Sequence, residues 1–170
     1  MTDEKRPARP AVQYGPTGET VAANVKSLRT RRGMTIYALS GALAKIGRPI
    51  TASAIAKIEK QQRQVTVDDL VALASALQVS PDTLLLPWTD HGDEIVEVTG
   101  AGNLPAADVW SWAAGSNPPR LSEVDPVGEL QRFQADARPP YARPLLTASS
   151  LTLSESQRAK FIAAGYAIDD

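Results

Sequence analysis

The sequence predicts a mostly α fold, in which a five-helix domain over residues 18–87 is followed by a smaller, partly irregular acidic C-terminal region with helices. Three observations predict it. Apolar residues between positions 18 and 87 recur at the three- and four-residue spacing of one helix face. Thr, Ser, Gly and Pro stand where these helices should begin and end. No alternation of apolar and polar residues in this stretch indicates a strand.

The first two expected helices are separated by a glycine. Apolar residues of the first helix recur at i, i+4 and i+7, at Val21, Val25 and Leu28. Gly33 ends this helix, and Thr35 can cap the second one. The second helix should turn three apolar residues inward, Leu39, Leu43 and Ile46, before Gly47 and Pro49 end it.

Threonines can also cap the third and fourth helices, because their side-chain oxygen accepts a hydrogen bond from a first-turn amide. Thr51 begins a short third helix, with Ile55 and Ile58 on its apolar side. Thr66 begins the fourth, where Asp69 stands at the third position and complements the helix dipole. The expected buried face of the fourth helix comprises Val67, Leu70, Leu73, Ala74 and Leu77. Ser80 and Pro81 start a fifth helix, which Pro87 closes.

The two ends of the chain are expected to be less regular. Residues 1–17 are charged and rich in Pro and Gly, and we interpret them as a flexible N-terminal arm. Residues 88–170 should supply dimer, partner or effector contacts. In this region the patterns predict one short strand over 93–98, helices over 106–114 and 127–137, and a last helix capped by Ser154. Trp110 and Trp112 are interpreted as core anchors.

Charge is distributed unevenly along the chain. The whole sequence has 18 basic and 19 acidic residues and a formal net charge of −1. Between Lys26 and Arg63, however, nine basic residues accompany a single acid, Glu59, whereas residues 88–170 carry a net charge of −6. A basic segment inside an acidic protein suggests that one face of the molecule meets a polyanion.

Composition also argues against several classes of site. The chain has no Cys, which excludes disulfides, thiolate nucleophiles and zinc–thiolate sites. His91 is the single histidine, so we expect no metal site and no cofactor. No apolar run approaches the length of a membrane span, and the N-terminal residues have no signal-peptide pattern. We therefore expect a cytoplasmic protein.

The second and third helices, with the link between them, predict a helix-turn-helix, a motif that places a short helix in the DNA major groove. Three stretches carry the pattern: TIYALSGAL at 35–43, ITASAIAKIE at 50–59 and DDLVALASALQVSPDTLL at 68–85. With these stretches, residues 18–87 resemble the lambda-repressor-like (XRE, Cro-type) helix-turn-helix family of bacterial and phage regulators. The sequence departs from the family in a longer link between Leu43 and Ile50, and in Gln61, where the family often has Gly.

The resemblance implies an ion pair between Arg29 and Glu59. The distribution of charge independently favours the same pair. Glu59 is the lone acid of the basic segment, and a carboxylate facing DNA would repel phosphate. An acid at this position is better explained as turned inward and paired with a guanidinium, in a structural role.

Two sets of DNA contacts follow from the helix-turn-helix interpretation. Side chains near the start of the third helix would reach base edges in the major groove. The expected base contacts are Thr51, Ala52, Ser53, Ala54 and Lys57. Other polar and basic residues bracket this helix and would contact phosphates. The expected phosphate contacts are Tyr37, Lys45, Arg48, Lys60, Arg63 and Gln64.

The leading functional prediction is a sequence-specific DNA-binding transcriptional regulator, a repressor, that binds double-stranded DNA as a homodimer. The alternative is an antitoxin-like or partner-binding regulator whose C-terminal half binds another protein. A self-cleaving repressor would need Ser122 and Lys160 as nucleophile and base. We expect no enzyme, because such a catalytic domain is rich in β-structure and this half predicts one strand.

Overall fold

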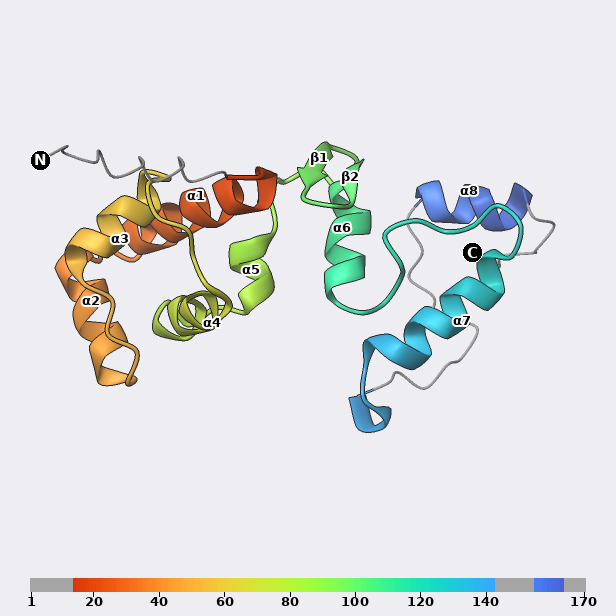
Figure 1. The fold of residues 1–170 in the computed structure, drawn as a ribbon. Helices are drawn as coiled ribbons and strands as arrows, with labels where there is room; N and C mark the ends of the chain where they lie inside the picture. The colour runs from red at the N-terminus through yellow and green to blue at the C-terminus, as the bar shows by residue number, and fades with distance from the viewer. Residues whose placement is uncertain (1–13, 143–154, 164–170) are drawn as a thin grey trace, which may run out of the picture. The chain divides into compact units, whose positions relative to one another are not determined.

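The computed structural model describes residues 14–142 and 155–163 (Figure 1). The chain divides into two compact units, a first unit of residues 1–85 and a second unit of residues 86–170. The predicted fold class is confirmed, because the chain is mostly helical, with a helical N-terminal unit and a second unit that combines a small sheet with helices. Among the helices of the described residues, none has the length and apolar character that crossing a membrane requires.

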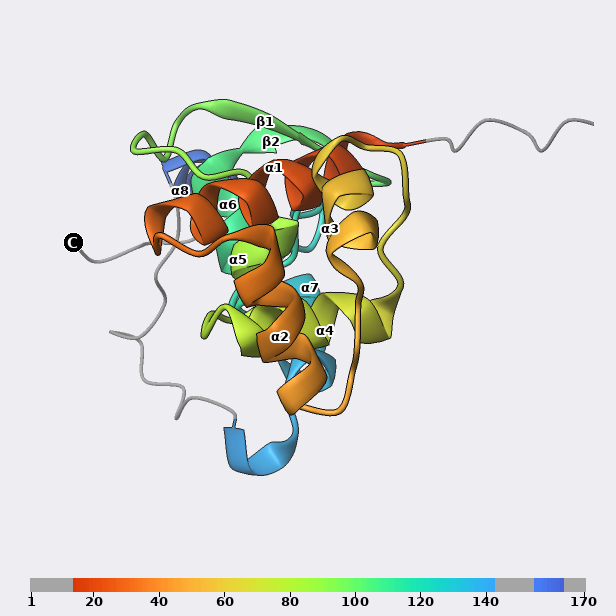
Figure 2. The same cartoon turned by 90° about the vertical axis from the view of Figure 1, so that its left-hand side faces the viewer.

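The five predicted helices of the first unit are all present. Their bounds are α1 Pro16–Arg31, α2 Ile36–Lys45, α3 Ala52–Glu59, α4 Val67–Ala76 and α5 Pro81–Leu85. α2 and α3 pack against each other along one side of this unit, with α1, α4 and α5 beside them (Figures 1 and 2). α1 begins at Pro16, so the last two residues of the expected flexible arm are helical; residues 1–13 lie outside the described residues.

Threonine caps begin the three helices for which the sequence predicts them. The hydroxyl oxygens of Thr35, Thr51 and Thr66 each accept a hydrogen bond from the backbone N–H three residues later, at 3.0, 3.2 and 3.2 Å. Such a cap contributes about 1 kcal/mol. The starting points of α2, α3 and α4 are therefore fixed by local sequence, before any tertiary packing is considered.

Helices α1 to α4 all end in the same way. The residue after each C-cap has a positive φ: Gly33 at 63°, Gly47 at 82°, Gln61 at 57° and Gln78 at 49°. The next backbone N–H then bonds to the carbonyl five residues earlier, which is the Schellman arrangement. Two glutamines therefore occupy a left-handed conformation that glycine adopts at lower cost.

The long link between α2 and α3 is a closed loop. After Gly47 the Arg48 N–H bonds to the Leu43 carbonyl at 3.1 Å. The Ser40 hydroxyl donates to the Ile50 carbonyl at 2.7 Å, and the Ile50 side chain is 4% exposed. The additional residues of this link thus leave the packing of α3 against α2 intact.

The core of the first unit lies between the helices. Its largest fully buried side chains include Val25, Leu39, Leu43, Ile55, Ile58, Leu73, Leu77 and Leu84. The predictions for Ile46 and Val67 are wrong, because these residues are 47% and 78% exposed. Ile46 is the C-cap of α2, where the inward face of the helix has ended. Val67 shares the outer face of α4 with Val71 and Ser75, at four-residue spacing, and this face points away from Leu73.

The second unit begins with a β-hairpin and continues with helices. β1 Ile95–Val98 pairs antiparallel with β2 Gly102–Pro105, with Val96 opposite Leu104. α6 Ala106–Ala113, α7 Pro126–Ala137, the 3-10 turn η1 Pro140–Ala142 and α8 Glu155–Ala163 follow. The sequence predicts the first strand and three helices. It does not predict β2, because the stretch GNLP lacks β-branched and aromatic residues. The predicted cap, Ser154, lies outside the described residues.

The tryptophans predicted to anchor the core of this unit are less buried than expected. Trp110 and Trp112 are only half-buried, and the buried residues are mainly aliphatic. The Trp110 ring instead meets the edge of Trp88, with 6.3 Å between ring centroids. Its Nε1 donates a hydrogen bond to the Pro87 carbonyl at 3.2 Å. Trp110 therefore fixes the first residues of the second unit against α6.

Candidate nucleic-acid interface

Helix α3 has one face inside the first unit and one face outside it. Ala54, Ile55 and Ile58 are buried. Ser53 and Lys57, one turn apart, are exposed on the opposite side. The outer face therefore carries a hydroxyl and an ammonium group, and no carboxylate.

The five residues expected to contact bases differ in their exposure to solvent. Thr51, Ser53 and Lys57 are exposed, and Ala52 is half-buried. The expectation for Ala54 is wrong, because this residue is 8% exposed. Ala54 lies one turn before Ile58 and therefore turns to the core with it. Thr51 caps α3 through its oxygen, which leaves the hydroxyl hydrogen as a donor.

Arg29 and Glu59 are joined by a partly buried ion pair in the first unit. The Arg29 Nε lies 2.6 Å from Glu59 Oε1, and its Nη2 lies 2.9 Å from Oε2. The Arg29 side chain is 14% exposed and that of Glu59 is 7% exposed. The hydrogen bond that Arg29 donates to Glu59 raises the pKa of Arg29, so this guanidinium stays charged. Its Nη1 also donates to the Met34 carbonyl at 2.7 Å, just before α2.

The pair has two consequences for the interface. It connects α1, the start of α2 and the end of α3 through one side chain, which fixes the orientation of α3. It also turns the one acid of the basic segment away from the outer face of α3. A polyanion approaching α3 therefore does not meet the charge of Glu59 directly.

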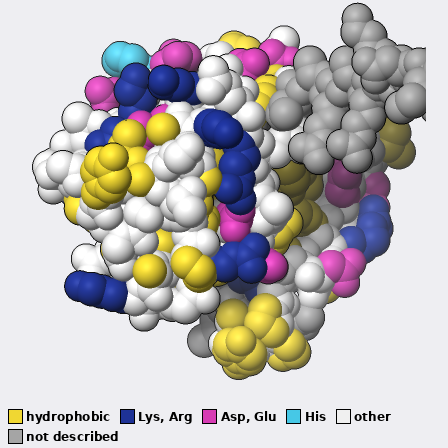
Figure 3. All heavy atoms as spheres, turned by 60° about the vertical axis from the view of Figure 1, so that its left-hand side comes forward, with side chains coloured by type: hydrophobic (Ala, Val, Ile, Leu, Met, Phe, Trp, Pro, Cys, Tyr) yellow, Lys and Arg dark blue, Asp and Glu magenta, His cyan; other side chains and the backbone are white. Residues whose placement is uncertain are grey.

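Four of the six expected phosphate contacts are exposed side chains around α3. Tyr37 stands in the first turn of α2 with 80% of its side chain exposed. Lys45 is in the last turn of α2, and Lys60 is the C-cap of α3. Gln64 lies in the link to α4 and is also exposed. Figure 3 shows Lys and Arg side chains in several groups in this view, with uncharged side chains and some Asp and Glu side chains between them.

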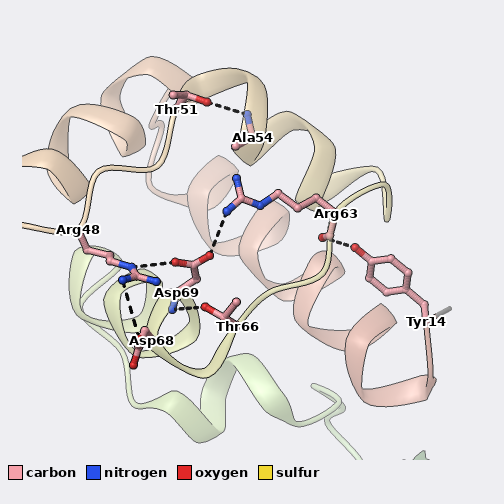
Figure 4. Close-up of polar contacts among 8 residues, drawn as sticks. All are labelled: Tyr14, Arg48, Thr51, Ala54, Arg63, Thr66, Asp68 and Asp69. Atoms are coloured by element: carbon pink, nitrogen blue, oxygen red, sulfur yellow. Dashed lines mark hydrogen bonds and ion pairs between the residues drawn. The ribbon is translucent and has the colours of Figure 1, made fainter. Parts of the chain in front are cut away.

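The other two expected phosphate contacts, Arg48 and Arg63, meet at one carboxylate. The Arg48 Nε donates to Asp69 Oδ1 at 2.9 Å, and the Arg63 Nη2 donates to Oδ2 at 3.2 Å (Figure 4). Asp69 is 3% exposed. Arg48 also lies 3.9 Å from the exposed Asp68. The sequence predicts a role for Asp69 at the helix start alone, whereas its carboxylate reaches both arginines.

A second residue that sequence reasoning missed is Tyr14. Its hydroxyl donates a hydrogen bond to the backbone carbonyl of Arg63, so it fastens the link after α3 to the start of α1 (Figure 4). Its ring lies against Gly18, where an added Cβ would be 3.0 Å from a ring carbon. Burial raises the pKa of the Tyr14 phenol above its usual value. Nothing in the sequence near residue 14 indicates this contact.

Other candidate sites receive no support from the geometry. The Lys160 Nζ donates to the Leu121 carbonyl at 3.2 Å, and the Ser122 hydroxyl accepts from the Val124 N–H at 3.2 Å. Nucleophilic catalysis requires a base bonded to the serine hydroxyl, which neither contact supplies. Within residues 14–142 and 155–163, no three His, Cys, Asp or Glu side chains are grouped to hold a metal.

Comparison with known proteins covers the region of this interface. Residues 25–84 match a family model described as Helix-turn-helix. The match begins inside α1 and ends inside α5, so it spans α2, α3 and the ion pair between Arg29 and Glu59. No curated protein and no solved structure matches the chain.

Proposed function

We propose that this chain, whose residues 25–84 form a helix-turn-helix domain of the XRE or lambda-repressor-like family, is a sequence-specific transcriptional regulator that reads DNA with α3. DNA binding and transcription regulation are what this family match supports. Insertion of α3 into the major groove, repression of the bound promoter and dimer formation are parts of the proposal.

The observation that carries the proposal is the division of α3 into two faces. Ile55 and Ile58 hold the helix in the core, while Ser53 and Lys57 point outward. A helix with its side chains is about 10–12 Å across, which suits the width of the major groove, about 12 Å. Lys57 can reach the O6 and N7 atoms of guanine, and the Ser53 hydroxyl can bond to several bases. Half-buried Ala52 presents a methyl group that can contact a thymine methyl.

Binding strength should come mainly from the residues around α3. Tyr37, Lys45 and Lys60 are exposed on α2 and at the end of α3, where they can contact phosphates on both sides of the groove. Each phosphate that a cation neutralises changes the slope of log K against log salt concentration by about −0.9. These contacts position the helix, and the few outward residues of α3 supply the base preference.

A homodimer is the expected binding form. The outer face of one α3 offers few base contacts, so binding of two copies to an inverted repeat would add affinity and specificity. We assign dimer formation to the second unit, since the first unit is occupied by its own core and by the proposed DNA face. A dimer of this kind would cover a promoter and act as a repressor.

Selection from a pool of random duplexes with the purified full chain tests the proposal. The selection is carried out at two salt concentrations, so that phosphate and base contacts can be separated. Enrichment of an inverted repeat, with affinity that falls steeply with salt, is the expected result. If no sequence is enriched while duplexes of any sequence bind alike, α3 does not read bases and the proposed function is wrong.

The alternative function is a regulator whose second unit binds another protein, in the manner of an antitoxin. The observation in its favour is that several apolar residues of that unit are exposed, among them Trp88 at 60% and Ile95 at 61%. A Trp88→Ala variant separates the two proposals. Loss of dimers in sedimentation would assign this surface to self-association, and unchanged dimers would leave it to a different protein.

A further inference from the structure

Asp69 is a buried carboxylate that binds one arginine from the segment before α3 and one from the segment after it. It stands at the third position of α4, where its N–H bonds to the Thr66 hydroxyl oxygen at 3.2 Å. Its Oδ1 accepts a hydrogen bond from Arg48, and its Oδ2 accepts one from Arg63 (Figure 4). The Asp69 side chain is 4% exposed, so its carboxylate accepts both hydrogen bonds from a largely buried position. Such charge-assisted bonds are stronger than neutral ones.

The two arginines lie symmetrically about α3 in the sequence. Arg48 precedes Ala52 by four residues, and Arg63 follows Glu59 by four residues. The Arg48 side chain is 46% exposed and that of Arg63 is 42% exposed, so both also face solvent. A guanidinium has five N–H donors. Each arginine can therefore bind Asp69 with one N–H and offer others to a DNA phosphate.

We propose that Asp69 is a positioning residue for DNA binding, which holds Arg48 and Arg63 next to each other at one carboxylate, ready to contact phosphate beside α3. This inference rests on the proposed function. Long arginine side chains lose conformational freedom when they bind, and a residue that orders them beforehand lowers that cost. Ordered arginine side chains matter most on the specific DNA site, because phosphate contacts there set the register in which α3 reads the bases.

Charge alone predicts the opposite effect. Asp69 is negative, so removing its charge should strengthen the attraction of the domain for every duplex. The two explanations therefore predict opposite changes in affinity for the specific DNA site when Asp69 loses its charge. Asp69→Asn distinguishes them, because asparagine has a similar shape and removes the charge that binds both arginines.

Asp68→Asn is the matched control. It changes the net charge equally, one residue away, but the Asp68 side chain is 80% exposed and approaches only Arg48, at 3.9 Å. We expect Asp68→Asn to strengthen binding to the selected duplex and to a random duplex alike, by about twofold. We expect Asp69→Asn to weaken binding to the selected duplex about tenfold and to leave the random duplex unchanged or bound more tightly.

The salt dependence and the affinity ratio distinguish positioning from a merely structural role. For Asp69→Asn on the selected duplex, the salt slope should become shallower by about 0.9 for each phosphate that Arg48 or Arg63 no longer neutralises. A variant that only loosened the fold would lower its thermal midpoint and weaken both duplexes alike. Binding is measured at a temperature at which circular dichroism shows both variants folded.

Three outcomes overturn the inference in different ways. If Asp69→Asn behaves as Asp68→Asn does, Asp69 positions nothing. If Asp69→Asn does not fold, Arg63→Lys carries the test, because it keeps the charge and removes the guanidinium fork. An unchanged ratio of specific to random affinity in Arg63→Lys contradicts the inference. If the wild-type chain selects no duplex from the random pool, the proposed function itself is wrong. In the first two outcomes the wild type still binds a selected duplex, and only the role of Asp69 is wrong.

Discussion

Arg29 and Glu59 form an ion pair with two parallel hydrogen bonds, of 2.6 and 2.9 Å, that connects α1 to the last residue of α3. The same guanidinium binds the Met34 carbonyl ahead of α2. One side chain thus determines where α2 starts relative to the end of α3. We expect the pair to support the proposed reading face of α3 without contacting DNA.

Removing one partner of this pair should strongly destabilise the first unit. Arg29→Ala leaves the Glu59 carboxylate, 7% exposed, without its cation. We expect a decrease of about 3–5 kcal/mol in the free energy of unfolding. Urea unfolding followed by circular dichroism measures it. The control is Arg132→Ala, which breaks an exposed pair with Asp125 and should cost less than about 1 kcal/mol. Equal costs would show that burial of the pair is unimportant.

Lysines on and after α3 should affect DNA binding differently. Lys57 is on the outer face of α3, so Lys57→Ala should weaken binding to the selected duplex by about 1–3 kcal/mol and relax the base preference at one position. Lys60 is the C-cap, so Lys60→Ala should weaken all duplexes alike and reduce the salt slope by about 1. Fluorescence anisotropy with matched duplexes measures both. If the two variants are indistinguishable, Lys57 does not contact a base.

The left-handed glutamines offer a gain in stability. Gln61 has φ of 57° after α3, and Gly adopts this conformation without the Cβ penalty. Gln61→Gly should raise the free energy of unfolding by about 0.5–1 kcal/mol. The control is Gly33→Gln, at φ of 63° with no atom within 4 Å of an added Cβ, which should lower it by a similar amount. A Gln61→Gly variant less stable than the wild type would mean that the glutamine side chain makes a compensating contact.

Stability should respond to alkaline pH through Tyr14. Burial raises the pKa of this phenol in the folded chain above its usual value near 10. The folded state therefore keeps the proton to higher pH than the unfolded state does, and the resulting contribution to stability is complete below the unfolded pKa. It is lost as pH rises through the folded pKa. The stability advantage of the wild type over Tyr14→Phe should be constant from pH 7 to 9 and shrink above pH 10, as measured by urea unfolding. An advantage that grows above pH 10 would contradict the raised pKa.

Features of the fold encoded by short stretches of sequence are predictable. Thr35, Thr51 and Thr66 are identifiable as helix caps because the cap depends on residues three positions apart. Helical spacing assigns five side chains in and next to α2 and α3 to the core. Leu39, Leu43, Ile55 and Ile58 are fully buried, whereas Ile46, the C-cap of α2, is 47% exposed. These rules work because a helix face is determined by its own periodicity.

Features that depend on tertiary arrangement could not be predicted. Asp69 resembles an ordinary helix-start residue, since nothing local shows that Arg48, 21 positions earlier, reaches it. Ala54 is misplaced on the outer face because alanine is small enough for either side of a helix. β2 escapes detection because pairing with β1 determines its conformation, and its Gly and Pro residues disfavour a strand by themselves.

On α3, the residues that pack in the core are different from those proposed to contact bases. Ala54, Ile55 and Ile58 hold the helix in place, and Glu59 ties its end to α1, whereas Ser53 and Lys57 project on the opposite side. Substitutions at these two outward positions should therefore alter target choice at little cost to thermal stability. A library randomised at Ser53 and Lys57 would retain a common scaffold, from which regulators with new operators could be obtained.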